Sequence, residues 1–239
     1  MPRILLLGST FAIATLLAAT ACGADVADTP AGAAADPPLP PPPATTSGPL
    51  TKANLPSASR VGPDFKPYVE PDNPEEGIVS NGSAVHARDP QQVSDGIVPL
   101  GCPGVDALPR LPVPAHALEE TYRTPQGLAA VALTLEYGSE GQATRLVDGL
   151  AAMLATCTPP VSASELSTSR LVADVRRPDA ASVFDTRREV GPDAATTQWD
   201  ETVVRTGKRV SLVMVERPPT APVDNQRALA TGMKAMLAK

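Results

Sequence analysis

Residues 118–157 read LEETYRTPQGLAAVALTLEYGSEGQATRLVDGLAAMLATC, and this stretch decides the fold. Side chains of different character alternate in residues 118–123 and again in residues 130–137, which is the two-residue period of a β-strand. Gln126-Gly127, between the two runs, marks a turn. The stretch therefore predicts two strands connected through a turn.

A helix is predicted directly after the second strand. Ser139, with Gln142 three residues later, fits a capping box at its start. Pro159-Pro160 prevents the helix from continuing. The apolar residues between these signals recur at helical spacing along one face: Ala143, Leu146, Val147, Leu150, Leu154 and Cys157.

The remaining elements follow toward the C-terminus. Strands are predicted near residues 171–175, 183–190, 196–205 and 209–216, and the last two flank a hairpin turn with Gly207 at the left-handed position. Both alternating sets of the 209–216 strand are apolar, so it is expected to be covered on both faces. Asp224 is the expected cap of a last helix.

Upstream of residue 118 the patterns are weaker. Thr51 can cap a single helical turn that ends before Pro56. Residues 61–101 are rich in turn residues and show no clear period, and the acidic run 70–76 is typical of a solvated loop. The overall prediction is an α+β domain over residues 50–239, with a mostly antiparallel sheet of about five strands packed by two main helices.

The N-terminus predicts export and a lipid anchor. Residues 1–21 combine Arg3, an apolar run and small residues, as in a signal peptide. Cys22 follows directly and resembles the cysteine of a bacterial lipobox, although Ala19 stands where Leu is usual. The resemblance implies cleavage before Cys22 and diacylglycerylation of its thiol, and the alternative is ordinary cleavage with Cys22 as a bystander. Residues 22–49 are Pro- and Ala-rich and predict a disordered tether.

Two further cysteines remain in a chain that is predicted to be exported. Cys102 and Cys157 most simply pair in a disulfide, and the alternative is two free buried thiols. A bridge would close a loop of about 55 residues and stabilise the fold by roughly 4 kcal/mol in the chain-entropy account. No metal site is expected, because His86 and His116 have no partner nearby at ligand spacing.

Composition excludes several functional classes. The 239-residue chain has a net charge of -6 and no basic stripe, so neither nucleic acid nor an anionic lipid surface is an expected electrostatic partner. No nucleophile elbow, phosphate loop or dinucleotide fingerprint is present, so we expect neither an enzyme nor a bound cofactor. Trp199, Arg187 and Arg188 are the candidate ligand-binding residues, for stacking and for an anion. The competing interpretations are a structural Trp and solvent-facing strand ends.

The order of these elements resembles a known family. A Pro-rich tether leads into LTKANLP at residues 50–56, and a loop with Cys102 precedes the alternating strand and the helix that ends in Cys157. The hairpin VVRTGKRVSLVMVE at residues 203–216 and a last helix follow. Together they resemble the extracellular sensor domain of PknH-like kinases and its free-standing actinobacterial lipoprotein relatives. Many members carry two disulfides, whereas this chain can form one if Cys22 is lipidated.

The resemblance implies an α+β domain with a cleft proposed to bind an unknown ligand. We therefore expect an envelope lipoprotein on the outer side of the cell membrane, with a non-catalytic domain that senses or binds a small molecule or lipid. The alternative is a structural or partner-binding lipoprotein that serves a protein complex of the cell envelope.

The cysteine prediction is tested by mass. Residues 50–239, exported through an oxidising compartment and denatured without reductant, should be two hydrogens lighter than the fully reduced chain. Peptide mapping should join Cys102 to Cys157. The full reduced mass would show free thiols and contradict the prediction.

Overall fold

The structure of the chain is a computed structural model that describes residues 40–73, 79–97, 110–155, 169–179, 183–190, 197–218 and 227–239. For residues 154–155, 169–179, 183–190, 197–198 and 227–228 it describes the backbone alone. The chain divides into the units Met1–Pro38 and Leu39–Lys239, of which the first lies outside the described residues. In the described part of the chain, no helix has the length and apolar character needed to cross a membrane.

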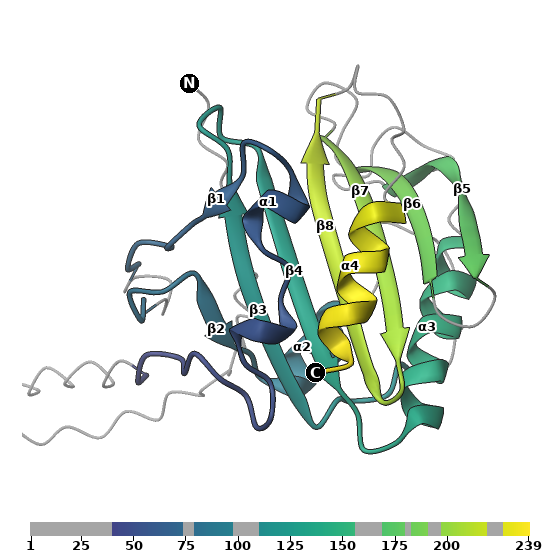
Figure 1. Ribbon diagram of the computed structural model, residues 1–239, viewed down its shortest axis with the longest axis horizontal. Helices are drawn as coiled ribbons and strands as arrows, with labels where there is room; N and C mark the ends of the chain where they lie inside the picture. Colours follow the sequence, from purple (N-terminus) through teal and green to yellow (C-terminus); the bar gives the residue numbers. More distant parts are fainter. Residues whose placement is uncertain are drawn as a thin grey trace, which may run out of the picture. The chain divides into compact units, whose positions relative to one another are not determined.

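One sheet forms the centre of the described domain (Figure 1). Its eight strands, as far as the chain is described, are β1 (Lys66–Pro67), β2 (Val85–Ala87), β3 (His116–Arg123), β4 (Ala129–Glu136), β5 (Ser169–Asp179), β6 (Val183–Val190), β7 (Thr197–Thr206) and β8 (Arg209–Arg217). They lie in the order β1-β3-β4-β8-β7-β6-β5, with β2 also paired to β3. All of these pairs are antiparallel, and the expected α+β class is confirmed.

The sheet is larger than the expected five strands or so. The two unforeseen strands, β1 and β2, are two and three residues long. Both lie in the turn-rich region before residue 101 and pair with β3. Strands of two or three residues are too short to show a two-residue period. Pairing with the neighbouring strand, rather than their own sequence, sets their extended conformation.

The helices are η1 (Lys52–Asn54, a 3-10 turn), α1 (Ala58–Val61), α2 (Pro90–Gly96), α3 (Glu140–Ala155) and α4 (Arg227–Leu237). The two long ones, α3 and α4, confirm the expected main helices, and Thr51 caps η1 as predicted. Ser139 Oγ accepts from the backbone N–H of Gln142 at the start of α3, again as predicted. The expected cap Asp224 lies outside the described residues.

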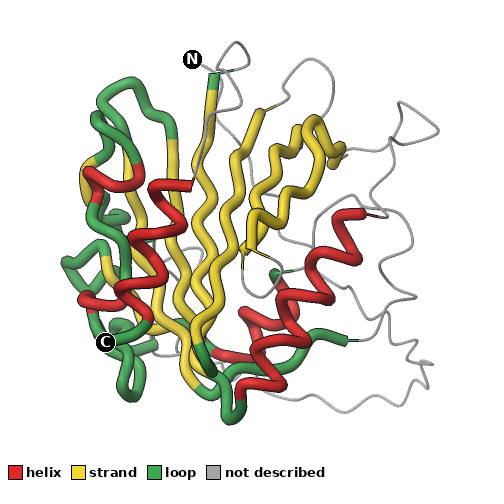
Figure 2. The backbone as a smooth tube through the Cα atoms, turned by 45° about the vertical axis from the view of Figure 1, so that its right-hand side comes forward, coloured by secondary structure: helices red, strands yellow, loops and turns green. Residues whose placement is uncertain are grey.

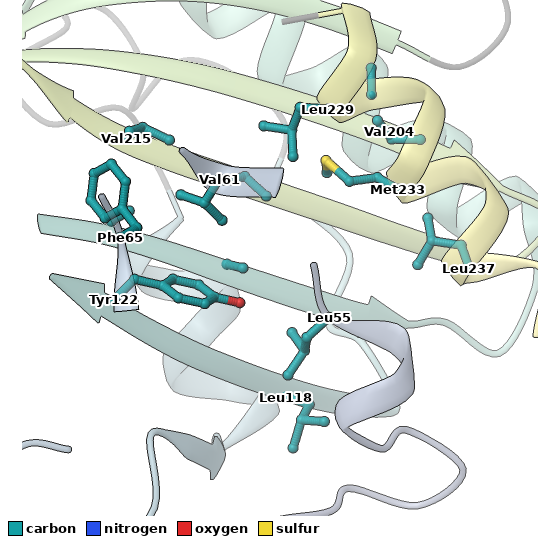
Figure 3. Close-up of a cluster of buried hydrophobic side chains, with 14 of the residues drawn as sticks. Leu55, Val61, Phe65, Leu118, Tyr122, Val204, Val215, Leu229, Met233 and Leu237 are labelled. Carbon is teal, nitrogen blue, oxygen red and sulfur yellow. The ribbon is translucent and has the colours of Figure 1, made fainter. Parts of the chain in front are cut away.

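Helices cover both faces of the sheet (Figures 1 and 2). One core lies under α4, α1 and η1 and contains Leu55, Tyr122 and Met233 (Figure 3). A second core lies under α3 and α2 and contains Val93, Leu146 and several residues of the central strands. The domain is therefore built in three layers, with the sheet in the middle.

The central strands supply residues to both cores in alternation. Ala132 of β4 lies opposite Val213 of β8, and the next pair, Leu133 and Leu212, faces the other side. The first pair belongs to the α4-side core, and the second packs against the α3-side core. The expectation that residues 209–216 are covered on both faces is confirmed. At the β7–β8 turn, Gly207 has a φ of +56°, as its predicted left-handed position requires.

The LTKANLP segment is held to the sheet by buried polar contacts. The Thr134 hydroxyl donates to the Asn54 carbonyl at 2.9 Å, and the Asn54 amide donates to the Met236 carbonyl at 3.4 Å. Lys52 Nζ lies 3.0 Å from Oε1 of Glu120, whose side chain is buried. These contacts join a segment near the N-terminus to β3, β4 and the end of α4.

The Tyr122 hydroxyl has two hydrogen-bond acceptors, the Pro56 carbonyl and the Glu120 carboxylate, for its single proton. The Tyr122 hydroxyl lies 2.5 Å from the Pro56 carbonyl oxygen and 2.9 Å from Glu120 Oε2, yet it has one proton to donate. Burial and the adjacent Glu120 carboxylate raise the pKa of Tyr122 well above its usual range, so the hydroxyl stays protonated. When Glu120 is ionised, one of these two acceptor oxygens therefore receives no hydrogen bond from Tyr122.

This proton count predicts the effect of substitution at Glu120. In Glu120→Gln the amide N–H donates to Tyr122 Oη, and every acceptor gains a donor. Its stability to urea should stay within about 1 kcal/mol of the natural chain, because Lys52 is mostly exposed. Tyr122→Phe leaves both acceptors without that donor and should cost about 2 kcal/mol. Equal losses in the two variants would mean that the Glu120 charge itself holds the segment.

Candidate functional site

The predicted site residues fall into two groups. Cys22, Cys102 and Cys157 lie outside the described residues, so the anchor and the disulfide remain predictions. Trp199, Arg187 and Arg188 lie on neighbouring strands β7 and β6. Trp199 and Arg188 occupy directly opposite positions in the antiparallel pair, while Arg187 is opposite Asp200. The backbone therefore brings Trp199 and Arg188 to one place and puts Arg187 on the alternate position.

The two faces of the central strands differ in how completely they are covered. On the α4 side, Ala130, Ala132, Val213 and Val215 are each at most 1% exposed. On the α3 side, the corresponding large residues are only half-buried. These residues are Val131 and Leu133 of β4, Leu212 and Met214 of β8, and Trp199 of β7. We call these five residues the Trp199 surface.

The Trp199 surface follows from the strand register. Leu133 lies opposite Leu212, and Val131 lies opposite Met214. On the far side of β8, Met214 is opposite Glu201, and Trp199 is two residues before Glu201 on the same face of β7. The four aliphatic side chains therefore lie next to one another across β4 and β8, and Trp199 lies diagonally from Met214, with Glu216 directly opposite Trp199. Large apolar residues in the middle of a sheet are usually buried, so partial exposure here is informative.

The fully buried carboxylates are paired with cations. Lys208 Nζ and Arg209 Nε donate to Glu136 at 2.8 and 2.7 Å. Arg217 Nε donates to Asp200 Oδ2 at 3.1 Å. Although burial alone would raise the pKa of Glu136, the hydrogen bonds and charges of its two partners lower it below 4.5. Glu136 is therefore stabilised as an ion, which suits a structural role better than proton transfer at neutral pH.

Glu119 is the acid with the opposite perturbation. Burial raises the pKa of Glu119 above 4.5, against the lowering effect of Arg88 and His86. Arg88 Nη1 donates to Glu119 Oε1 at 2.9 Å, and His86 lies opposite Glu119 on β2. Glu119 is not among the residues predicted from the sequence, because a carboxylate in an alternating strand is typical of a solvated position. A carboxyl group with a raised pKa beside a histidine is the kind of group that functional sites often contain.

The histidines do not come together. His86 is buried on β2, whereas His116 begins β3 and packs against Gly48. In the described part of the chain, no group of three or more His, Cys, Asp or Glu side chains is arranged to hold a metal ion. His116 lies opposite Glu136, which is paired with Lys208 and Arg209.

Comparison with known proteins finds a likeness among solved structures and none among sequences. No protein-family model matches the chain, and no curated protein matches it. Among solved structures, the extracellular domain of PknH from Mycobacterium tuberculosis is similar, with 13% sequence identity and a TM-score of 0.45. The match covers 78% of this chain and 91% of that one.

Glu136 gives the fold a predictable dependence on pH. Its pKa is lower in the folded chain than its ordinary value of 4.5. Ionised Glu136 therefore stabilises the fold above pH 4.5, and this contribution is lost as the pH falls through the folded-state pKa. Urea midpoints of the natural chain and Glu136→Gln should differ most at neutral pH and converge in acid. A difference that stays constant with pH would contradict this assignment.

Proposed function

We propose that the protein is an envelope lipoprotein, anchored through Cys22, whose α+β domain binds a ligand on the outer side of the membrane without transforming it. The observation that carries the binding proposal is the Trp199 surface, where large apolar side chains remain half-buried in the middle of the sheet. The signal peptide and lipobox pattern at residues 1–22 support the address.

The composition of the surface favours a ligand with an apolar body. Leu133, Leu212 and Met214 offer aliphatic and thioether contacts, which adapt to varied shapes. Trp199 adds a flat ring at one end of the patch, suited to stacking on a chain or a sugar face. Arg188, at the register position opposite Trp199, places a cationic residue next to the ring on the adjacent strand. A lipid or an apolar glycan precursor with an anionic group has the matching chemistry.

A binding role without catalysis is favoured by the state of the charged groups. Glu136 and Asp200 are buried and each lies within hydrogen-bond distance of an arginine, so both acids are already engaged in contacts that hold the strands together. Glu119 has a raised pKa but lies beside Arg88 on β3, on the other side of β4 from Trp199.

Ligand binding is tested with the lipidated full chain purified from envelopes. Native mass spectrometry after incubation with a total envelope lipid extract should show a bound mass that raises the melting temperature. Met214→Gln and Trp199→Ala should each raise the dissociation constant at least about tenfold, the equivalent of 1.4 kcal/mol. Val69→Gln is the matched control, because Val69 is 44% exposed and lies outside the Trp199 surface.

The outcomes separate the two parts of the proposal. Equal binding by all three variants would remove the Trp199 surface as the site. No bound mass and no thermal shift with the natural chain would remove ligand binding altogether. A chain recovered without lipid on Cys22 would contradict the anchor and leave the binding result to stand by itself.

A partner-binding role has one observation in its favour. Beside β1, at one edge of the sheet, the exposed Arg123 guanidinium lies over the half-buried Tyr68 ring, 4.0 Å from the ring centroid. Val69, next to it, is among the most exposed large apolar residues that the structure describes. Tyr and Arg are enriched where proteins bind each other. Loss of an envelope cross-link in Val69→Glu, with ligand binding intact, would favour this second role.

A further inference from the structure

Glu216 of β8 is a strand carboxylate without a cationic partner among the described residues. Its side chain is half-buried, and its Oε2 accepts a hydrogen bond from the Ala129 backbone N–H at 2.9 Å. By contrast, the buried strand acids Glu120, Glu136 and Asp200 each form an ion pair with a lysine or an arginine. The charge of Glu216 is therefore balanced by solvent or by a ligand.

Glu216 lies between two members of the Trp199 surface. Strand alternation puts it on the same face of the sheet as Met214, which is two residues before it on β8. The register puts it directly opposite Trp199 of β7. Met214 and Trp199 are both half-buried. A ligand that covers these two side chains therefore also covers the Glu216 carboxylate.

Covering Glu216 has a consequence for the chemistry of the ligand. Removing water from an ionised carboxylate is unfavourable unless a cation or a hydrogen-bond donor replaces that water. The Ala129 N–H donates to Oε2, so Oε1 depends on a group from the ligand. A purely apolar ligand leaves the charge uncompensated, and a purely anionic one adds repulsion. An ammonium group compensates it, and an adjacent indole ring attracts the same cation.

The other flank of Trp199 carries the opposite charge. Arg188 of β6 occupies the register position directly opposite Trp199 across the β6–β7 pair. Because β8, β7 and β6 are neighbours in the sheet (Figure 1), the order across it is Glu216, Trp199, Arg188. The acidic and basic positions are two strand spacings apart, roughly 10 Å. Opposite charges on the two sides of an aromatic residue match a zwitterionic head group.

We propose that the Trp199 surface selects a zwitterionic amphiphile, whose ammonium group pairs with Glu216 and whose anionic group is received at the Arg188 position. This rests on the ligand binding proposed above and specifies the head group of that ligand. The apolar body extends from Met214 toward Leu212 and β4. A phospholipid with an aminoethyl phosphate head group has this chemistry, since two carbons join its two charges. Glu216 discriminates against anionic lipids of the same apolar body.

The head-group preference is tested with the lipidated full chain and three phospholipids that share the same acyl chains. Phosphatidylethanolamine carries both charges, phosphatidylglycerol has no ammonium group, and N-acetyl-phosphatidylethanolamine has lost the ammonium charge by acylation. In native mass spectrometry titrations, phosphatidylethanolamine should have a dissociation constant at least about tenfold lower than either of the others. Equal constants, or tighter binding of phosphatidylglycerol, would overturn the proposal.

The role of Glu216 is tested by Glu216→Gln, which removes the charge and keeps an oxygen for the Ala129 N–H. The preference for phosphatidylethanolamine over phosphatidylglycerol should fall below about twofold in this variant. Glu70→Gln is the matched control, because it removes the same charge from an exposed residue that follows β1, and it should keep the preference. An unchanged preference in Glu216→Gln would overturn the assignment. The N-acetylated lipid makes the equivalent change on the ligand and leaves the chain natural.

Two negative results have different meanings. If none of the three lipids binds the natural chain, lipid binding at the Trp199 surface is removed, and the head-group selection with it. If all three bind equally and Met214→Gln weakens them alike, the surface remains the binding site and the head-group selection alone is overturned. A preference for phosphatidylethanolamine that Glu216→Gln abolishes and Glu70→Gln retains supports both.

Discussion

The antiparallel pairing of β4 with β8 is the constraint on which the rest of the domain depends. Its register puts Ala132 against Val213 on one face and Leu133 against Leu212 on the other. A slip of one residue would turn the side chains of the shifted strand to the opposite faces. Small residues of the α4 side would then lie where the larger residues of the α3 side now lie. Because both faces of this pair are apolar, neither can be left to solvent, and helices must pack on each. The three-layer arrangement follows from that requirement.

The parts of the fold with long periods could be predicted from the sequence. The β3–β4 pair, α3 and the β7–β8 hairpin each show a pattern that one structure satisfies. The short elements could not be predicted by period, because β1 and β2 exist through pairing with β3. Helix α2 did carry a signal, since Asp89 caps it and Pro90 occupies its first turn. Only two residues of α2 are buried, so the helix has no apolar period in its sequence that would support the capping signal.

The candidate site was harder to predict, for two physical reasons. Buried carboxylates in strands are stabilised by cations that are distant in sequence: Glu120 by Lys52, 68 residues away, and Glu136 by Lys208, 72 residues away. Local patterns do not contain such pairs. The Trp199 surface depends on which helix covers which face, and alternation predicts two apolar sets without saying which is left partly open. Trp199 is among the ligand-binding residues predicted from the sequence, but its apolar neighbours have the sequence pattern of ordinary core residues.

The difference between the two faces has a cause in how the chain ends are used. The α4 side is sealed by material from both ends: residues 50–56 and α1 from the N-terminal half, and α4 at the C-terminus. Asn54 ties these together by donating to the Met236 carbonyl, while Arg209 of β8 holds the end of α4 to the sheet by donating to the Leu237 carbonyl. The α3 side receives α2 and α3 from the middle of the chain, and Arg205 of β7 donates to Glu140 of α3 at 2.7 Å. A face closed by both chain ends is costly to open, since each contact there holds two segments at once. Partly exposed apolar surface can therefore remain in the folded domain on the α3 side, where α2 and α3, both from the middle of the chain, cover the sheet.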